Sequence, residues 1–453
     1  MGLQGSPPMG ASVAKPSGVR RLGLEDEVIW ICEDLGCAGP ILLVMDFAGR
    51  LDERLLAHAA RLLPAAEPAL ACRVEATPDG PVWRPLDDLD AASWFTLHET
   101  DDPETAIRAI LTPRPEHHGS TFHLHLARHA HGDSLLLWLT HVIGDGFWTY
   151  ECAYRLAGIY SGLAADPGYA PKPNTAPPVG LEWMDRLGWR DTWRITRRDL
   201  ATALRSRGTV VGFRRDYDAY RAAGTPDAAH VVHRLSADTV ATIDRAGVRG
   251  VSRNDMLLAA FARAFPEFVG GSATGSAGAT VKIALTVDLR RFAEGRPLRA
   301  PGNMVGIAYV TLGSDLGPRF DDTLALVAAE TGRQKRDLMG VGNPLFVKLL
   351  GALPYRWRRR LVEAILRRSM AKPLFPTLSN AGTVDAGRLR FAAAAPEAVE
   401  VAFYPPALPL FLVSVLRYRD TIALTACFQP ADLEPQRVRG LLERIEREIR
   451  DGS

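Results

Sequence analysis

The sequence predicts an α/β protein built from two similar units, each of which mixes strands and helices. The chain has 453 residues, which is too many for one compact hydrophobic core. Both halves contain segments with the two-residue alternation of strands and segments with the 3.6-residue period of helices. Between the halves, the stretch ADPGYAPKPNTAPP at 165–178 carries prolines that exclude both a helix and an inner strand. These observations favour two α/β units joined by a linker.

We therefore divide the chain into four parts. The first is a flexible lead-in rich in Gly, Ser and Pro, without the apolar core of a signal peptide. Two α/β units follow, separated by the linker and by a helical stretch rich in Trp and Arg that bridges onward. The predicted parts are the lead-in at 1–18, the first unit at 19–164, the linker and bridging helices at 165–227, and the second unit at 228–453.

The composition is that of a globular protein without a strong electrostatic preference. Hydrophobic residues make up 47% of the chain, and 54 basic against 52 acidic residues leave a net charge of +2. A balance this even gives no overall attraction to nucleic acid. The five cysteines form no paired metal-binding motif, which favours reduced thiols, a cytoplasmic protein and no bound metal. The most apolar late run, at 401–416, is short and broken by prolines, so we expect no transmembrane segment.

The first unit alternates strand and helix signals. Residues 40–49 (PILLVMDFAG) have the composition of a strand, and residues 51–64 place leucines and alanines on one helical face. Residues 121–140 alternate apolar residues with histidines, turn at HGDS and return as an apolar strand, which predicts a hairpin. Aromatic residues at helical spacing in 146–162 predict that a helix follows directly.

The second unit shows the same mixture of elements. A cap at Ser252 or Asn254 begins one helix, and we expect Pro266 to end it. A glycine-rich loop, GGSATGSAGA, leads into a strictly alternating strand. The predicted elements are a strand at 229–236, helices at 237–247 and 251–266, strands at 280–292 and 302–312, and a helix at 436–449.

The strongest local signal is the stretch LLLWLTHVIGDGFW at 135–148, where an apolar strand ends in a histidine. His141 is followed by Asp145 four residues later, then by Gly146 and a helix. The same HxxxD spacing occurs at His98 and at His129, but there it runs into a proline or lies in a hairpin turn. We interpret those two as coincidences, because only the third context holds a side chain rigidly at the edge of a cleft.

A histidine in this position can act as a general base. The side chain titrates near neutrality, so a neutral imidazole can accept a proton from a hydroxyl or an amine. Asp145 then has two alternative roles: it orients the imidazole of His141, or it points away and holds the loop through an arginine. Gly146 allows a tight chain path without a clashing Cβ. The alternative interpretation is a core histidine at a strand end followed by a solvated aspartate.

Other motifs extend this signal along the chain. HVIGDG resembles the HxxxDG core of the condensation-domain-like, CoA-dependent acyltransferase superfamily, which includes peptide-synthetase condensation domains, polyketide-associated acyltransferases, alcohol acyltransferases and wax ester synthases. Four further motifs occur in the expected order, and the similarity spans roughly residues 20–449. They are SRNDMLLAAFARAF at 252–265, TVDLRRF at 286–292, GNMV at 302–305 and LSNAGTVD at 378–385. Ordered matches are more specific than any single motif.

The resemblance implies a fold and a set of roles. It implies two chloramphenicol-acetyltransferase-like lobes arranged as a V, with a tunnel between them and His141 at its middle. An acyl thioester would enter from one side and an acceptor from the other. Asp145 would be structural and pair with Arg290 of the DLR segment. The family pattern is often HHxxxDG, and this chain has Thr140 where the first histidine would stand.

For several supporting residues, the sequence allows more than one interpretation. Ser379 and Asn380 can donate hydrogen bonds near a developing oxyanion, or they form a polar strand end. Asn303 is interpreted as a residue that sets a loop near the tunnel. Asn254 and Asp255 are interpreted as a helix cap. Arg290 has the alternative of a surface cation. The candidate site residues are His141, Asp145, Gly146, Arg290, Asn303, Ser379 and Asn380.

The segment YRWRRRLVEAILRRSMAK at 355–372 combines many basic residues with an apolar stripe. A solvated amphipathic helix is the default interpretation. The alternatives are a docking face for CoA phosphates, for an acidic carrier protein or for an anionic membrane surface, and the sequence alone does not predict membrane association. For the acyl donor, we take Arg358, Arg359 and Arg360 as weak docking candidates.

The sequence thus predicts an acyltransferase. Through the resemblance, it would move an acyl group from a CoA or carrier-protein thioester to a hydroxyl or amine of a small-molecule acceptor, in specialised metabolite or lipid biosynthesis. We expect a monomer with no permanently bound cofactor, no metal and no nucleic-acid partner, and acyl-CoA or an acyl carrier protein as co-substrate. The alternative is a non-catalytic condensation-like protein that binds a carrier protein or an acyl chain.

Overall fold

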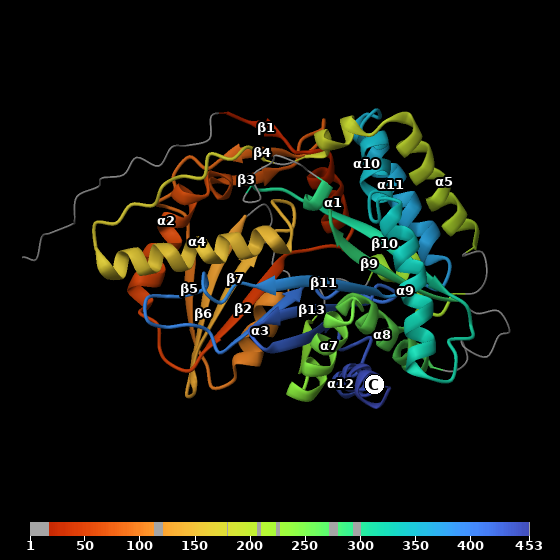
Figure 1. The fold of residues 1–453 in the computed structure, drawn as a ribbon. Coiled ribbons are helices and arrows are strands. Elements are labelled where there is room, and N and C mark those ends of the chain that lie inside the picture. The colour runs from red at the N-terminus through yellow and green to blue at the C-terminus, as the bar shows by residue number, and fades with distance from the viewer. Residues whose placement is uncertain are drawn as a thin grey trace, which may run out of the picture.

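Strands and helices alternate through both halves of the computed structural model (Figure 1). It describes residues 18–112, 121–178, 180–205, 210–222, 227–270, 280–292 and 300–452. These residues form two large mixed sheets and one small sheet, which confirms the predicted α/β class. Residues 1–17 of the predicted lead-in and 271–279 of the glycine-rich loop lie outside the described residues.

The N-terminal sheet has five strands in the order β12-β2-β7-β6-β5. The predicted hairpin is confirmed as the antiparallel pair β6 and β7. Helices α2 and α4 pack on one face of the sheet and α3 on the other. The elements are β2 (Ile41–Phe47), α2 (Glu53–Ala66), β5 (Phe95–Glu99), α3 (Pro103–Leu111), β6 (Phe122–His129), β7 (Gly132–Leu139), α4 (Gly146–Ala165) and β12 (Ala398–Phe403).

The C-terminal sheet has six strands in the order β10-β9-β11-β13-β14-β8. Helices α7, α8 and α12 pack together on this half, and α9 contacts α8 and β10. The elements are β8 (Ala229–Arg234), α7 (Ala237–Val248), α8 (Arg253–Val269), β9 (Val281–Asp288), β10 (Val305–Leu312), α9 (Phe320–Arg336), β11 (Thr377–Val384), β13 (Leu412–Tyr418), β14 (Thr421–Phe428) and α12 (Pro435–Asp451).

A layer of smaller elements completes the fold. In Figure 1, α1 lies at the top between the two halves, and α5, α10 and α11 lie on the right. A three-stranded sheet of order β1-β4-β3 packs beside the first half. These elements are β1 (Arg20–Arg21), α1 (Leu24–Asp34), β3 (Cys72–Glu75), β4 (Val82–Pro85), α5 (Trp189–Arg205), α6 (Tyr217–Arg221), α10 (Gly342–Leu350) and α11 (Tyr355–Met370), with short 3-10 turns at Pro68–Ala71, Leu181–Arg186 and Arg290–Phe292.

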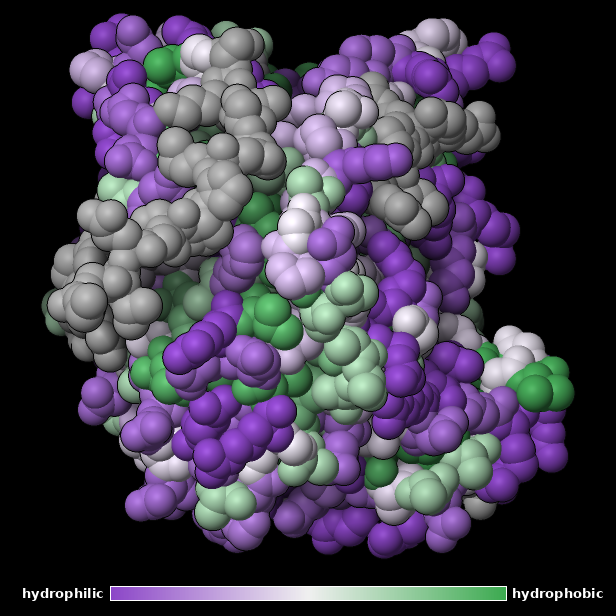
Figure 2. Space-filling model, turned by 90° about the vertical axis from the view of Figure 1, so that its left-hand side faces the viewer, coloured by the Kyte–Doolittle hydropathy of each residue, from purple (hydrophilic) through white to green (hydrophobic). Residues whose placement is uncertain are grey.

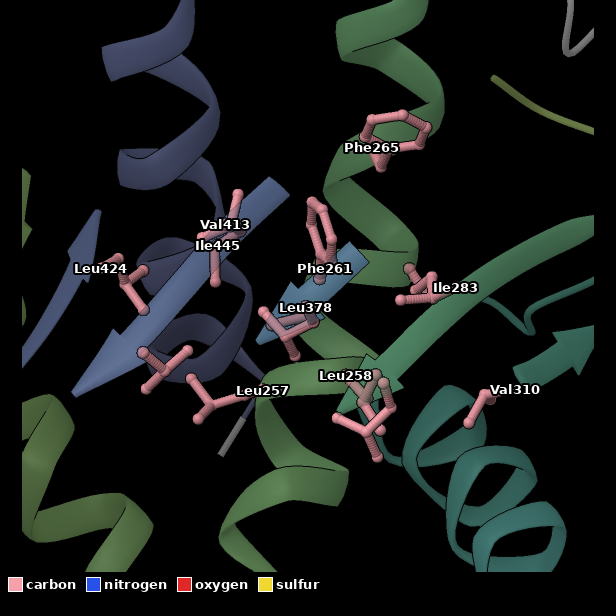
Figure 3. Close-up of a cluster of buried hydrophobic side chains, with 14 of the residues drawn as sticks. Leu257, Leu258, Phe261, Phe265, Ile283, Val310, Leu378, Val413, Leu424 and Ile445 are labelled. Atoms are coloured by element: carbon pink, nitrogen blue, oxygen red, sulfur yellow. The ribbon is translucent and has the colours of Figure 1, made fainter. Parts of the chain in front are cut away.

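The core of the C-terminal half is built around α8. Figure 3 shows Phe261 and Phe265 of α8 in one buried cluster with side chains of the sheet strands and with Ile445 of α12. The expectation that Pro266 ends this helix is wrong, because α8 continues to Val269. Packing of the Phe265 and Phe268 rings near Phe411, with ring centroids 6.2 and 5.3 Å away, offsets the hydrogen bond that a proline cannot donate.

One strand crosses between the two halves. β12 comes from the second half of the sequence, yet it pairs antiparallel with β2 at the edge of the N-terminal sheet. Its neighbours in sequence, β11 and β13, belong to the C-terminal sheet. The predicted division at 164 and 228 stays a prediction, but the two sheets share this segment of chain.

The surface on the N-terminal side is mostly hydrophilic, with apolar side chains gathered near the middle of this face (Figure 2). Among the described residues, no helix is both long enough and apolar enough to cross a bilayer.

Candidate active site

His141 lies in the turn that connects β7 to α4. β7 ends at Leu139, and α4 begins at Gly146. The residue as a whole is partly exposed. The ring nitrogen Nδ1 is buried and has no hydrogen-bond partner among the residues that the structure describes. No carboxylate therefore orients this imidazole through Nδ1, which separates the site from a His–Asp pair of the triad type.

Asp145 is the structural centre of the loop. It is 1% exposed, and its side chain caps α4 by accepting hydrogen bonds from the backbone N–H groups of Phe147 and Trp148 at 3.1 and 3.3 Å. Its other oxygen, Oδ2, accepts a hydrogen bond from the backbone of Met304 at 2.8 Å. Both oxygens also accept from Arg290, at 2.9 and 3.0 Å. These bonds hold the carboxylate in place, away from the imidazole.

Arg290 reaches the loop from the other half of the molecule. It follows β9 in a short 3-10 turn, and its side chain is buried between the two sheets. The guanidinium lies 4.5 Å from the ring centroid of Phe147. A bidentate contact to a buried carboxylate is a strong, directional interaction. The end of a C-terminal strand is thereby joined to the start of an N-terminal helix.

Asn303 holds the backbone of the histidine itself. Its side-chain amide donates to the carbonyl oxygens of His141 at 3.0 Å and Val142 at 3.4 Å, and also to the Asp26 carboxylate at 2.9 Å. The preceding Gly302 forms an isolated parallel bridge with Gly144. The loop of the first half is thus fixed by the GNMV segment of the second half.

Two carboxylates on α1 complete the surroundings, and the sequence analysis missed both. Glu33 accepts a hydrogen bond from the Thr140 hydroxyl at 3.3 Å. Burial raises the pKa of Glu33 to about 7, although bonds from Thr140 and the backbone of His141 oppose the shift. Burial also raises the pKa of Asp26 to about 6, against the opposing bond from Asn303. Near pH 7 the Glu33 carboxyl is therefore only about half ionised, whereas the Asp26 carboxyl is still mostly ionised.

A signal for α1 was present in the sequence. Leu24, Val28, Ile31 and Leu35 have helical spacing, and three acidic residues stand in the first turn. The helical period predicts the helix itself, but it does not predict that this helix lies across the two halves.

Thr140, which stands where the family pattern often has a first histidine, has a structural role here. Its hydroxyl accepts from the backbone N–H of Val142 at 3.3 Å while it donates to Glu33. Its own N–H donates to the carbonyl of Thr121 at 3.0 Å. The side chain is buried, so it stabilises the turn that carries the neighbouring histidine.

Sterically, position 144 requires a glycine and position 146 does not. A Cβ added at Gly144 would lie 2.9 Å from the side chain of the buried Trp148. At Gly146, an added Cβ would meet only the hydroxyl of Tyr150, at 3.9 Å, which is an ordinary contact. The steric reason expected for Gly146 is therefore found two residues earlier, because Trp148 folds back over the loop.

Ser379 and Asn380 lie on β11 and contact other residues. The Ser379 hydroxyl is 3.4 Å from that of Thr286. The Asn380 amide donates to the side chain of Asn254, which was expected as a helix cap, and accepts from the N–H of Gly382 at 2.8 Å. Among the described residues, no hydrogen bond joins either side chain to the His141 loop. Their proposed oxyanion role stays a prediction.

Two of the three arginines expected to dock an acyl donor are engaged within the chain. Arg358 forms a bidentate ion pair with Glu27 at 2.5 and 2.6 Å, and both side chains are nearly buried. Arg359 pairs with Asp34. Arg360 is exposed. The Arg358 pair stabilises the packing of α11 on α1, because a buried guanidinium without its carboxylate would be costly, and the more exposed Arg359 pair adds a second contact between the same helices.

The described residues contain no group of three or more His, Cys, Asp or Glu side chains arranged to hold a metal ion.

Comparison with known proteins places the fold. No family model matches the chain, and no curated protein matches its sequence. Solved structures match over nearly the whole chain. The first condensation domain of the CDA synthetase is 17% identical, with a TM-score of 0.67 over 96% of this chain and 97% of that one. TRI3 trichothecene 15-O-acetyltransferase from Fusarium sporotrichioides is 13% identical, with a TM-score of 0.69 over 95% and 94%. The chain has the condensation-domain fold.

A third similar structure is that of polyketide synthase associated protein 5 from Mycobacterium tuberculosis, 18% identical, with a TM-score of 0.66 over 95% of this chain and 97% of that one. The condensation-domain fold is thus shared with a protein of different description. The fold expected from the motifs is confirmed, while the tunnel between the lobes stays a prediction. At this level of identity the shared fold does not specify a reaction.

Proposed function

We propose that this protein is an acyltransferase that moves an acyl group from a CoA or carrier-protein thioester to a hydroxyl or an amine, forming an ester or an amide. The observation that carries the proposal is the position of His141. The partly exposed His141 stands at the junction of the two halves, on a loop that Arg290 holds through Asp145 and that Asn303 also holds from the second half. A rigidly held base at an interface between lobes suits attack on an activated carbonyl.

In this proposal His141 acts as the general base. Because Nδ1 is buried, Nε2 is the nitrogen that faces the substrates. The neutral imidazole accepts the proton of the acceptor as its oxygen or nitrogen attacks the thioester carbonyl carbon. The new C–O or C–N bond forms, the C–S bond breaks, and the proton passes from His141 to the departing sulfur. The products are the ester or amide and a free thiol.

The remaining candidate residues have supporting roles in this scheme. Asp145 and Arg290 keep the loop rigid and do not touch the substrates. Ser379 is the better candidate for a hydrogen bond to the developing oxyanion, because the Asn380 amide is already bonded to Asn254. A well-placed donor of this kind can contribute a few kcal/mol.

The proposed donor is the thioester of CoA or of a carrier protein, and the proposed acceptor is a small molecule. The similar structures include a peptide-synthetase condensation domain and a trichothecene 15-O-acetyltransferase. By analogy with these, we propose a role in specialised metabolite or lipid biosynthesis in the cytoplasm.

The test is product detection by intact mass. The purified protein is incubated with a panel of acyl-CoA and acyl-carrier thioesters and small alcohols and amines. We expect an ester or amide product with the wild-type protein and none with His141→Ala. A product of equal amount with the variant would refute the general-base role. If no thioester gives a product but the protein binds an acyl carrier protein tightly, the non-catalytic alternative is correct.

A further inference from the structure

The exposed apolar side chains of this protein are concentrated on one group of helices. Of the twelve exposed large hydrophobic residues in the part of the chain that the structure describes, eight lie on α5, on α10 and the turn after it, or on α11. Scattered single apolar residues are normal on a protein surface, but a concentration of this kind indicates a binding surface. The eight residues are Trp189, Trp193, Phe346, Leu349, Leu353, Trp357, Leu361 and Ile365.

Helix α11 presents its apolar stripe to solvent. Trp357, Leu361 and Ile365 follow each other at four-residue intervals, so they share one face of the helix, and all three are exposed. Arg358 and Arg359 of the same helix form ion pairs with Glu27 and Asp34 of α1. The helix also turns Leu366 and Met370 inward, where they pack in a buried cluster, so the exposed stripe is apolar surface beyond the part that the core uses. Intramolecular packing therefore does not explain this stripe.

Helices α10 and α5 extend the same kind of surface. On α10 and the turn after it, Phe346, Leu349 and Leu353 lie at helical spacing and are exposed, and Leu349 is 62% exposed. On α5, Trp189 is 76% exposed and Trp193 stands one turn later. α10 packs against α5, and residues 351–354 connect α10 directly to α11. Figure 1 shows the three helices together on one side of the molecule.

Unpaired arginines accompany the tryptophans. Among the described residues, no ion pair involves Arg356, Arg360 or Arg368 on α11, or Arg190 or Arg197 on α5. Four of them lie over tryptophan rings: the guanidinium carbon is 5.2 Å from the ring centroid for Arg360 and Arg197, 5.4 Å for Arg190 and 6.0 Å for Arg356. We call these eight apolar and five basic residues the Trp–Arg surface.

We propose that the Trp–Arg surface binds peripherally to an anionic lipid membrane. Apolar side chains would enter the boundary between headgroups and acyl chains, while the guanidinium groups would bind lipid phosphates. Tryptophan is enriched at this boundary because its ring is apolar and its N–H is polar. The helices would lie along the membrane surface.

The charge of the surface argues against a second copy of the chain as the occupant. A symmetric dimer would bring two clusters of unpaired arginines together, which is repulsive. The high exposure of Trp189 and Leu349 favours a fluid layer that deforms around projecting side chains. Helix α1 connects α11 to the candidate site, because Arg358 of α11 pairs with Glu27 of α1 and the neighbouring Asp26 contacts Asn303. The proposal itself does not depend on acyl transfer.

The test is co-sedimentation of the full chain with vesicles. Vesicles of phosphatidylcholine with 30% phosphatidylserine are compared with pure phosphatidylcholine at low and at 0.5 M salt. We expect binding to the anionic vesicles only, and weaker binding at high salt. The triple change Arg356→Gln, Arg360→Gln and Arg368→Gln should weaken binding by about 10²-fold, since each arginine near an anionic surface contributes about fivefold. Trp357→Ser with Leu361→Ser should weaken it at least about tenfold.

Matched control variants carry equal changes elsewhere. Val248→Ser with Leu326→Ser removes two exposed apolar side chains outside the Trp–Arg surface. The second control is a triple variant that removes three exposed arginines: Arg249→Gln, Arg439→Gln and Arg447→Gln. Both controls should bind like the wild type, and thermal melting of all variants checks that they fold.

Several results would overturn the proposal. Wild-type protein that binds neutral and anionic vesicles equally, or neither, would refute it even if every variant misfolded. Dimerisation in sedimentation velocity that Trp357→Ser with Leu361→Ser abolishes, without vesicle binding, would identify a second copy as the occupant. Binding of an acidic carrier protein in place of vesicles would identify a protein partner. Because none of these assays measures turnover, a failure here is distinguishable from a failure of the proposed function.

Discussion

Asp145 and Asp133 occupy the same position in two HxxxD sequences and have nearly the same surroundings. Both are buried. Each forms a bidentate contact with an arginine and accepts a backbone N–H: Asp133 bonds Arg128 at 3.0 and 3.1 Å and the N–H of Leu51 at 2.8 Å. The interpretation of the second motif as a mere turn residue was incomplete, because Asp133 also anchors the strand-to-helix connection before α2.

The difference lies in what each aspartate connects. Arg128 is five residues from Asp133, on the paired strand of the same hairpin. Arg290 is 145 residues from Asp145 and belongs to the other sheet. His129 contacts its own turn through Ser134 at 3.5 Å, whereas the backbone of His141 is held by Asn303 from the second half. The HxxxD spacing alone therefore does not identify a catalytic histidine. What distinguishes His141 is its position at the junction between the two halves.

The largest expected effect separates the two histidines. His141→Ala should lower the turnover of the acyl-transfer reaction about 10²- to 10⁴-fold, because a general base is lost. His129→Ala should leave turnover unchanged, since that ring serves only its turn. Steady-state rates measure both, and thermal melting confirms folding. Equal losses in the two variants would remove the distinction.

The next effect separates the two aspartates by stability. Asp145→Ala leaves the buried Arg290 with only the exposed Asp288 at 3.4 Å, and should lower the free energy of unfolding by about 3–5 kcal/mol. Asp133→Ala should cost less, because Arg128 keeps Glu53 at 3.0 Å. Urea unfolding gives both values. In the double variant with Arg290→Ala, the two losses should be far from additive, and additive losses would break the pairing.

A smaller effect tests which glycine of HVIGDG the loop requires. Gly144→Ala should destabilise by about 1–3 kcal/mol, because the new Cβ meets Trp148. Gly146→Ala should change the free energy of unfolding by less than about 0.5 kcal/mol, since it adds only an ordinary contact at the start of α4. If chemical denaturation showed a larger loss of stability for Gly146→Ala than for Gly144→Ala, Trp148 would have to move aside for the new Cβ.

A pH-dependent effect tests the surroundings of Glu33. Its pKa rises from 4.5 to about 7 on folding, so the folded state binds the extra proton and the protein loses stability as pH rises between these values. Glu33→Gln should remove this loss. The stability of the variant relative to the wild type should therefore increase from about pH 4.5 to 7 and stay constant above pH 7. Urea midpoints across this range measure it; a flat difference would contradict the shift.

Glu446 provides a control of opposite sign. Burial opposes its ionisation, but hydrogen bonds from Ser236, Thr239 and His233 prevail and lower its pKa from 4.5 to about 2. Its contribution is present above pH 4.5 and is lost as pH falls toward 2. The difference in the free energy of unfolding between Glu446→Gln and the wild type should therefore become smaller as the pH falls from 4.5 toward 2. For Glu33→Gln, the corresponding difference changes as the pH rises.

Much of the site was predictable because its signals are local or belong to the motifs. The apolar strand into His141 and the helix after Gly146 follow from composition and period, and both are present. The partnership of Asp145 with Arg290 came from the family resemblance, not from any spacing in this chain. The α1 carboxylates were missed because no local pattern reports that a helix near the N-terminus will pack against a loop more than 100 residues later.

The sequence by itself determined which segments form strands and helices and where a histidine can be held rigidly, since apolar periodicity and turn residues act over a few neighbours. Only the tertiary structure decided that β12 joins the N-terminal sheet, that Asp133 is buried, and that the apolar stripe of α11 faces solvent. A period shows that a helix has an apolar side, but whether another element covers that side depends on packing between distant parts of the chain.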